Sequence, residues 1–173
     1  MKKTLIALSL ICAPVLCAQA ADGTIKFTGN ITDAACTVDT SSASQNVNLG
    51  TVSASAFATV GATAAPTKFS INLTDCPETV TKASVKFDGL VNTVNSDLLA
   101  LNTDSTATGV GIAIYEADSS TKLPLLTASL PQTIDSAAGA TNTLNFVAKY
   151  MSTAAKVAAG TANASTDFTI VYN

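Results

Sequence analysis

The side chains best suited to chemistry in this 173-residue chain are its four cysteines, ten aspartates and two glutamates, because it contains no histidine. Without histidine, neither a Ser-His-Asp triad nor a Cys-His pair can form, which removes the commonest machinery for acyl transfer. The acids stand mostly beside turn residues, as in TDCPE, FDG and EADSS. A hydrolase that uses paired carboxylates stays open as an alternative, but it needs a cleft that brings two acids together. We expect no catalytic residues and no cofactor.

The first twenty residues have the organisation of a secretory signal peptide. Two lysines precede an apolar stretch, and Ala18-Gln19-Ala20 is a small-x-small site that predicts cleavage between Ala20 and Ala21. The apolar stretch is short for a membrane span, so we expect no stable membrane insertion of the mature chain. The remaining residues, 21–173, amount to one domain in an oxidising compartment.

Cleavage would leave Cys36 and Cys76 as the cysteines of the mature chain. Two cysteines in an oxidising compartment most simply pair. Closing a loop of about 40 residues would stabilise the fold by roughly 4 kcal/mol. Two free thiols or an intermolecular bridge stay open as alternatives. We expect no metal site, since two thiols without histidine lack a tetrahedral set of ligands.

The mature chain is acidic. Nine lysines less the two in the signal peptide leave seven against twelve acids, a net charge of about −5, and the sequence has no arginine. Contacts with phosphate depend on clustered lysine and arginine, whereas these seven lysines are scattered. This composition excludes a nucleic-acid-binding protein.

Short runs with an apolar residue at every second position predict strands throughout the mature chain. After the opening stretch they are 67–76, 83–89, 109–118, 141–153 and 165–173. Each run has one apolar and one polar face, which is typical of antiparallel sheets. Connections rich in Ala, Ser and Thr separate them at 51–66 and 152–166, and a helix of a turn or two is possible only around 96–101. Several short strands around one disulfide indicate an immunoglobulin-like β-sandwich, without the usual tryptophan.

The opening stretch, GTIKFTGNITDAAC at 23–36, follows the same alternation. Ile25, Phe27 and Ile31 share one face. Gly29 lies between Phe27 and Ile31 and is the fourth member of that row. Each large side chain would contribute about 1.5 to 3 kcal/mol on burial. The pattern predicts a strand but does not say whose sheet it joins, and Gly29 as a bulge in an intramolecular edge strand stays open.

Four stretches, in this order, resemble the bacterial fimbrial subunits assembled by the chaperone-usher route. GTIKFTGNITDAACTVD looks like the amino-terminal extension of a pilin running into its first cysteine, and FSINLTDC like the segment that carries the second. GVGIAIYEADSSTKLPL resembles the mid-domain strand and turn, and LNFVAKYMST with DFTIVYN the carboxy-terminal signature. The similarity spans nearly the whole mature chain.

The resemblance implies an all-β fold, an incomplete immunoglobulin-like β-sandwich that lacks its last strand and has an amino-terminal donor-strand extension and one disulfide. It divides the chain into a signal peptide at 1–20, an extension at 21–33 and a pilin domain at 34–173. In the family, a groove takes the place of the missing strand.

The family's chaperone recognises the carboxy-terminal strand, which corresponds here to Gly160, Phe168, Ile170 and Tyr172. The extension of the next subunit then replaces the chaperone strand. Its residues correspond here to Ile25, Phe27, Gly29 and Ile31, with the glycine where the groove is shallow.

The function implied by the resemblance is that of a structural subunit of a bacterial fimbrium, not an enzyme, which polymerises by donor-strand exchange and supports cell adhesion. Its partners would be a periplasmic pilus chaperone, an outer-membrane usher and other subunits, as a homopolymer. It would pass through the periplasm to the cell surface. Two alternatives stay open: a minor subunit such as an adaptor or terminator, and an exported adhesin-like domain whose opening stretch fills its own groove.

Overall fold

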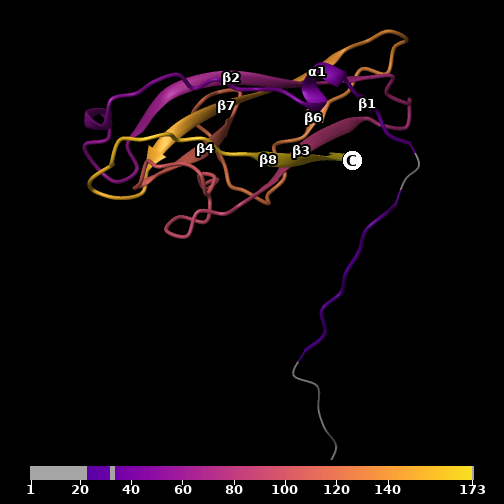
Figure 1. Ribbon diagram of the computed structural model, residues 1–173. Coiled ribbons are helices and arrows are strands. Elements are labelled where there is room, and N and C mark those ends of the chain that lie inside the picture. Colours follow the sequence, from indigo (N-terminus) through magenta and orange to yellow (C-terminus); the bar gives the residue numbers. More distant parts are fainter. Residues whose placement is uncertain (1–22, 32–33, 173) are drawn as a thin grey trace, which may run out of the picture. The chain divides into compact units, whose positions relative to one another are not determined.

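A computed structural model describes residues 23–31 and 34–172 of the chain (Figure 1). The predicted cleavage residues Ala20 and Ala21 lie outside the described residues. The chain divides into two units, Met1–Ile31 and Thr32–Asn173. Residues 23–31 of the first unit form neither helix nor strand, so the regular structure of the described residues belongs to the second unit.

The second unit is a sandwich of two sheets, with strand orders β1-β2-β7-β4-β5 and β6-β3-β8, and every strand pair is antiparallel. The strands are β1 Thr37–Val38, β2 Thr63–Thr74, β3 Lys82–Gly89, β4 Val110–Glu116, β5 Lys122–Leu123, β6 Gln132–Thr133, β7 Asn142–Ser152 and β8 Thr166–Tyr172. Among residues 23–31 and 34–172 there are two short helices, α1 Thr40–Ala43 and η1 Ala54–Ala56. The predicted all-β sandwich is therefore confirmed. The stretch 96–101 forms turns and no helix.

Alternating apolar residues of both sheets form the core between them. Phe69, Phe87 and Phe146 meet there with ring centroids 5.2 to 5.9 Å apart, and Phe87 stands edge-on to both others. Such aromatic pairs add about 0.5 to 1.5 kcal/mol to the effect of burial. These rings occupy the core in a chain that has no tryptophan.

Strand β4 differs from the expectation of one polar face, because all seven of its residues are buried. Its outward residues belong to a second apolar cluster, composed of Leu98, Ala113, Tyr115, Val147 and Met151. The stretch 96–101 thus supplies a leucine that covers the outer face of the sheet. This explains why its apolar spacing matched no regular element.

Strand β2 begins inside the predicted connection 51–66, with Pro66 near its start. The register against β7 shifts between Ala64 and Thr67, and Ala65 has a φ of 54°. Proline cannot donate a ladder hydrogen bond and is tolerated in sheets at bulges such as this one. Strand β2 therefore begins before the alternating run at 67–76 from which it was predicted.

The predicted disulfide between Cys36 and Cys76 is present and buried. It links the residue before β1 to the turn after β2, and β1 pairs with β2 through Thr37 and Thr74. No helix among residues 23–31 and 34–172 is long and apolar enough to cross a membrane.

Candidate strand-binding groove

Strand β8 lies at the edge of its sheet. Among the described residues it pairs only with β3, so its other edge carries no strand. Phe168, Ile170 and Tyr172 are half-buried and pack against the core, whereas Asp167 and Thr169 are exposed. The alternation predicted for this segment therefore sets an apolar row against the core, beside an unpaired backbone edge.

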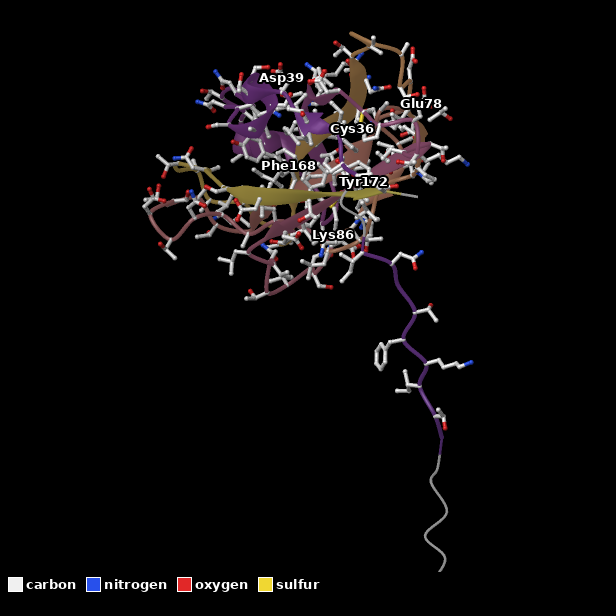
Figure 2. All side chains as sticks on the ribbon, turned by 90° about the vertical axis from the view of Figure 1, so that its right-hand side faces the viewer. Cys36, Asp39, Glu78, Lys86, Phe168 and Tyr172 are labelled. Carbon is white, nitrogen blue, oxygen red and sulfur yellow. A yellow bond between two sulfur atoms is a disulfide. The ribbon has the colours of Figure 1, made fainter. Side chains whose placement is uncertain are left out.

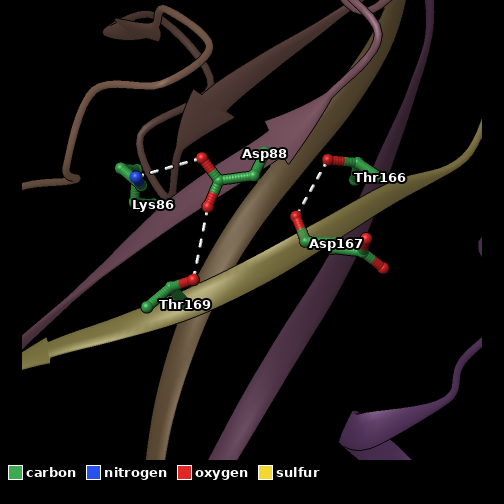
Figure 3. Close-up of polar contacts among 5 residues, drawn as sticks. All are labelled: Lys86, Asp88, Thr166, Asp167 and Thr169. Carbon is green, nitrogen blue, oxygen red and sulfur yellow. Dashed lines mark hydrogen bonds and ion pairs between the residues drawn. The ribbon is translucent and has the colours of Figure 1, made fainter.

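The outer face of β8 is held by polar contacts with β3 (Figure 3). Asp88 accepts a hydrogen bond of 3.2 Å from the hydroxyl of Thr169, and its other oxygen lies 3.1 Å from Nζ of Lys86. The hydroxyl of Thr166, which lines the groove on the same side of β8 as Phe168, donates to the carbonyl oxygen of Asp167 within β8. The contacts of Asp88 thus satisfy polar side chains on the outer face, away from the apolar row.

A groove of about 720 Å³ opens along the free edge of β8. Residues 164–168 form one border, and Val38 with residues 42–47 forms the other. The floor consists of core side chains of both sheets and a loop: Phe69, Ile71, Phe87, Leu99, Ile112, Ile114 and Ala148. The hydrophobic core is thus accessible where one more strand would lie.

The border opposite β8 is attached to the outer edge of β2. The amide of Asn72 donates to the hydroxyl of Ser42 at 2.9 Å, and the side-chain amide of Gln45 donates to the carbonyl of Ser70 at 3.1 Å. Asp39 caps α1 by accepting from the amide of Ser41, and its hydrogen bonds with Ser41 lower the pKa of its carboxyl. This attachment holds the border beside β2.

Tyr172, at the end of β8, lies close to Cys36 in Figure 2 and is not among the residues that line the groove. The phenol oxygen accepts a hydrogen bond of 3.1 Å from the amide of Cys36 and donates one of 3.4 Å to its carbonyl oxygen. Burial raises the pKa of Tyr172, and the hydrogen bond with Cys36 partly opposes this. The end of β8 is therefore tied to the start of β1.

The residues predicted to form a donor strand are exposed in the first unit. Ile25, Phe27 and Ile31 have exposed fractions of 78%, 91% and 104%. A Cβ placed on Gly29 would meet no atom within 4 Å. This apolar row is thus available for burial by another surface.

Gly160, predicted to belong with the groove strand, precedes β8 and does not line the groove. A Cβ on Gly160 would come within 2.4 Å of the amide nitrogen of Ala107 and of Oγ1 of Thr106. The glycine thus permits the loop before β8 to pack on the segment before β4. It also lines a second hollow of about 480 Å³, which no pattern in the sequence had indicated.

Some acidic residues of the described domain stabilise turns. Hydrogen bonds from the hydroxyl of Thr121 and from the amides of Thr121 and Ser120, the latter two of 2.8 Å, lower the pKa of the Asp118 carboxyl. Asp167 is the acidic residue among those that line the groove, so this site offers no carboxylate pair for glycoside hydrolysis. In the described part of the chain, no three histidine, cysteine or acidic residues gather to hold a metal.

Comparison with known proteins gives a consistent result. The family model described as fimbrial protein matches residues 25–173. The chain is 41% identical to the probable major fimbrial subunit LpfA of Escherichia coli O157:H7, over 97% of this chain and 93% of the relative. It is 40% identical to long polar fimbria protein A of Salmonella typhimurium, over 99% and 97% of the two chains.

Solved structures agree with the fold. An antigen and type I fimbria protein of Burkholderia pseudomallei is 34% identical, with a TM-score of 0.61 over 82% of this chain and 91% of that one. The P pilus rod subunit PapA is 22% identical and supports the fold alone, with a TM-score of 0.64 over 80% and 99% of the chains. A subunit of a chaperone-usher pilus, 23% identical, has a TM-score of 0.65 over 93% and 100%.

These matches confirm the predicted family, its structural and non-enzymatic role, and a location in surface fimbriae. The chain therefore belongs to the fimbrial protein family, and is a fimbrial subunit with the fold of chaperone-usher pilus subunits.

Proposed function

We propose that this chain is a rod-type fimbrial subunit that polymerises by donor-strand exchange. Its residues 25–31 would complete the sandwich of a neighbouring subunit, while its own groove accepts the same segment from another. The observation that carries this proposal is the 720 Å³ groove at the free edge of β8, whose floor is the hydrophobic core. A sheet edge beside an open core favours the addition of a strand from another molecule.

The proposed donor segment matches β8 in length and in its alternation of apolar residues. Residues 25–31 make seven positions, and β8 has seven residues. Every strand pair in the domain is antiparallel, and we infer the same for the donor, which puts Ile31 at the start of β8 and Ile25 near Tyr172. Burial of the three large side chains would contribute roughly 5 to 9 kcal/mol.

Before polymerisation, the open groove is an aggregation hazard. We propose that a strand of a periplasmic chaperone covers it by pairing with β8, and that an outer-membrane usher then brings the donor of the next subunit to it. The similarity to a subunit of a chaperone-usher pilus supports this route. Adhesion would be a property of the assembled fibre.

The relative described as a probable major fimbrial subunit supports a place in the shaft. Electron microscopy with an antibody against this chain tests that placement. Label along the whole shaft is expected, and label at one end alone would indicate a minor subunit.

Donor variants test polymerisation directly. Phe27→Asp and Gly29→Asn, in the full chain expressed with its chaperone and usher, are expected to accumulate in the periplasm but to form no fibres as the sole subunit. Thr28→Asp is the matched control, because it introduces the same charge on the alternate face and should retain fibres. Normal fibres from Phe27→Asp would contradict the proposal.

Deleting residues 21–32 separates this function from a self-complemented domain. The shortened chain should still fold when it is supplied with a peptide of residues 21–33. If residues 21–32 instead fill the groove of the same chain, the shortened chain should lose part of its core and unfold in the absence of peptide. The full chain should then bind no peptide, because its groove is already filled.

A further inference from the structure

The second hollow of the domain continues the line of the groove. Residues 42–47 border the groove and residues 50–54 border the hollow, so one chain segment runs from one to the other. On the other side, the groove is bordered by 164–168 and the hollow by 157–163. The hollow therefore begins where the groove ends, at the start of β8. Figure 1 shows the loop before β8 at the end of the sandwich opposite the C-terminus.

The hollow is built from packed residues. Phe57 and Val110, which line it, are buried, and the hydroxyl of Tyr150 donates to the carbonyl of Ala162 at 3.0 Å. The close approach of Gly160 to Thr106 fixes the loop on the segment before β4. Its shape thus follows from close contacts and not from a loosely attached loop.

The direction of the donor strand brings another subunit to this hollow. An antiparallel donor has Ile31 at the start of β8, and the first buried residue of the donor's own domain, Cys36, follows five residues later. Five residues span at most about 18 Å. The donor's domain must therefore lie against or very near the end of the acceptor that carries the hollow.

We propose that the hollow is a docking site for the domain of the next subunit, a second copy of this chain, which contacts it with the end around Cys36. This inference rests on the proposed donor-strand exchange. Such a contact would fix the angle between successive subunits, which a strand joined by a short linker does not do by itself.

The charges at the two ends are complementary. The disulfide holds Cys76 beside Cys36, and the neighbours Asp75 and Glu78 are exposed. Lys156 is exposed in the loop that forms the hollow. Within the described residues, none of these three charges takes part in an ion pair. Docking would bring the two acids of one copy toward the lysine of the other.

A charge exchange tests the contact in fibres of the full chain. Lys156→Glu and Glu78→Lys, each alone, should increase the rate at which fibres dissociate in SDS by roughly two- to fivefold, the effect of an exposed ion pair. The two substitutions combined in one chain should restore the wild-type rate, because each interface then regains opposite charges. Wild-type rates for both single variants would overturn the proposal.

A bulky residue in the hollow supplies a second test. Ala159→Trp should accelerate dissociation roughly fivefold or more, because overpacking destabilises a close contact. Ala128→Trp, at another exposed alanine, which lies beside β3, should leave the rate unchanged. Equal rates for the two tryptophan variants would overturn the docking site.

Binding of a labelled peptide of residues 21–33 separates this inference from the proposed function. The peptide should bind wild type, Lys156→Glu and Ala159→Trp equally when each full chain is refolded with an excess of it. Equal peptide binding together with wild-type fibre stability in the variants would overturn the docking site alone. Failure of the peptide to bind wild type would overturn donor-strand exchange, and the docking site with it.

Discussion

The phenol of Tyr172 is hydrogen-bonded to both backbone groups of Cys36, across 136 residues of the chain. Because Cys36 is also linked to Cys76, the start of β1, the end of β2 and the end of β8 meet at one point. This contact ties the end of β8 to the start of β1. The groove is bordered by residues 164–168 at the start of β8, where it adjoins the second hollow and where the inferred donor connects to its own domain.

Tyr172→Phe is expected to lower the free energy of unfolding by about 1 to 3 kcal/mol, because it leaves the partly buried amide and carbonyl of Cys36 without this partner. Urea unfolding of the full chain refolded with the donor peptide measures the change. Tyr150→Phe is the comparison, since that hydroxyl makes a single hydrogen bond, to Ala162. An equal or greater loss from Tyr150→Phe would contradict the role assigned to Tyr172.

Alkaline pH should destabilise the domain. Burial raises the pKa of Tyr115, Tyr150 and Tyr172 above the ordinary value of 10.0. A raised pKa in the folded state means that the neutral phenol favours folding, so this stability is complete below pH 10 and is lost as pH rises through the folded pKa. The free energy of unfolding, measured from pH 8 to 11, should fall at the upper end. Tyr172→Phe should make the fall less steep, and an unchanged slope would contradict the contribution of Tyr172.

The disulfide should account for a large part of the stability. Replacing both Cys36 and Cys76 with serine opens a loop with a sequence separation of 40 and should cost about 4 kcal/mol. Urea unfolding of the double variant, compared with wild type in the absence and presence of reductant, measures this loss. Reductant should destabilise wild type and leave the double variant unchanged. If the double variant were as stable as wild type, the disulfide would contribute little to the free energy of unfolding.

The strands could be predicted from the sequence because a period of two is local information. The row Phe168, Ile170 and Tyr172 faces the core, as its alternation indicated. The polar face expected of β4 and the connection expected at 51–66 were both partly wrong. Burial of the outer face of β4 depends on Leu98, and the start of β2 depends on a bulge at Pro66, and both follow from pairing between distant segments.

The groove was implied by the family resemblance and not by the alternating pattern. A row of apolar residues indicates that a strand has a buried face but not that the edge beside it lacks a neighbour. The contact between Tyr172 and Cys36 was likewise invisible, since a hydroxyl and a backbone amide carry no pattern in sequence. The disulfide between Cys36 and Cys76 could be predicted from the sequence. The signal peptide indicates export to an oxidising compartment, and the sequence after it contains two cysteines.

Gly160→Ala should destabilise the domain by about 1 to 3 kcal/mol, because the added methyl would overlap the backbone of Ala107 and the loop would have to move. Thermal unfolding of the peptide-bound chain measures the cost. Ala159→Ser, a change of similar size at the adjacent exposed residue, is the control and should shift the midpoint little. If the two variants unfold alike, the close approach at Gly160 does not constrain the loop.

Blocking the groove and blocking the donor should produce variants that complement each other. Ala164→Trp places a bulky ring in the groove at the start of β8, so this chain should donate its strand but accept none. Phe27→Asp should accept a strand but donate none, because an aspartate cannot occupy an apolar groove without a large cost of desolvation. Each variant alone should remain monomeric.

A mixture of Ala164→Trp and Phe27→Asp should form a dimer and no longer fibre, because it contains one working donor and one working groove. Size-exclusion chromatography with light scattering distinguishes monomer, dimer and fibre. Thr28→Asp mixed with Ala164→Trp is the control, and it should form fibres that end where the blocked subunit is incorporated. A mixture that stays monomeric would contradict the assignment of donor and acceptor to residues 25–31 and β8, since each partner retains the half that the other lacks.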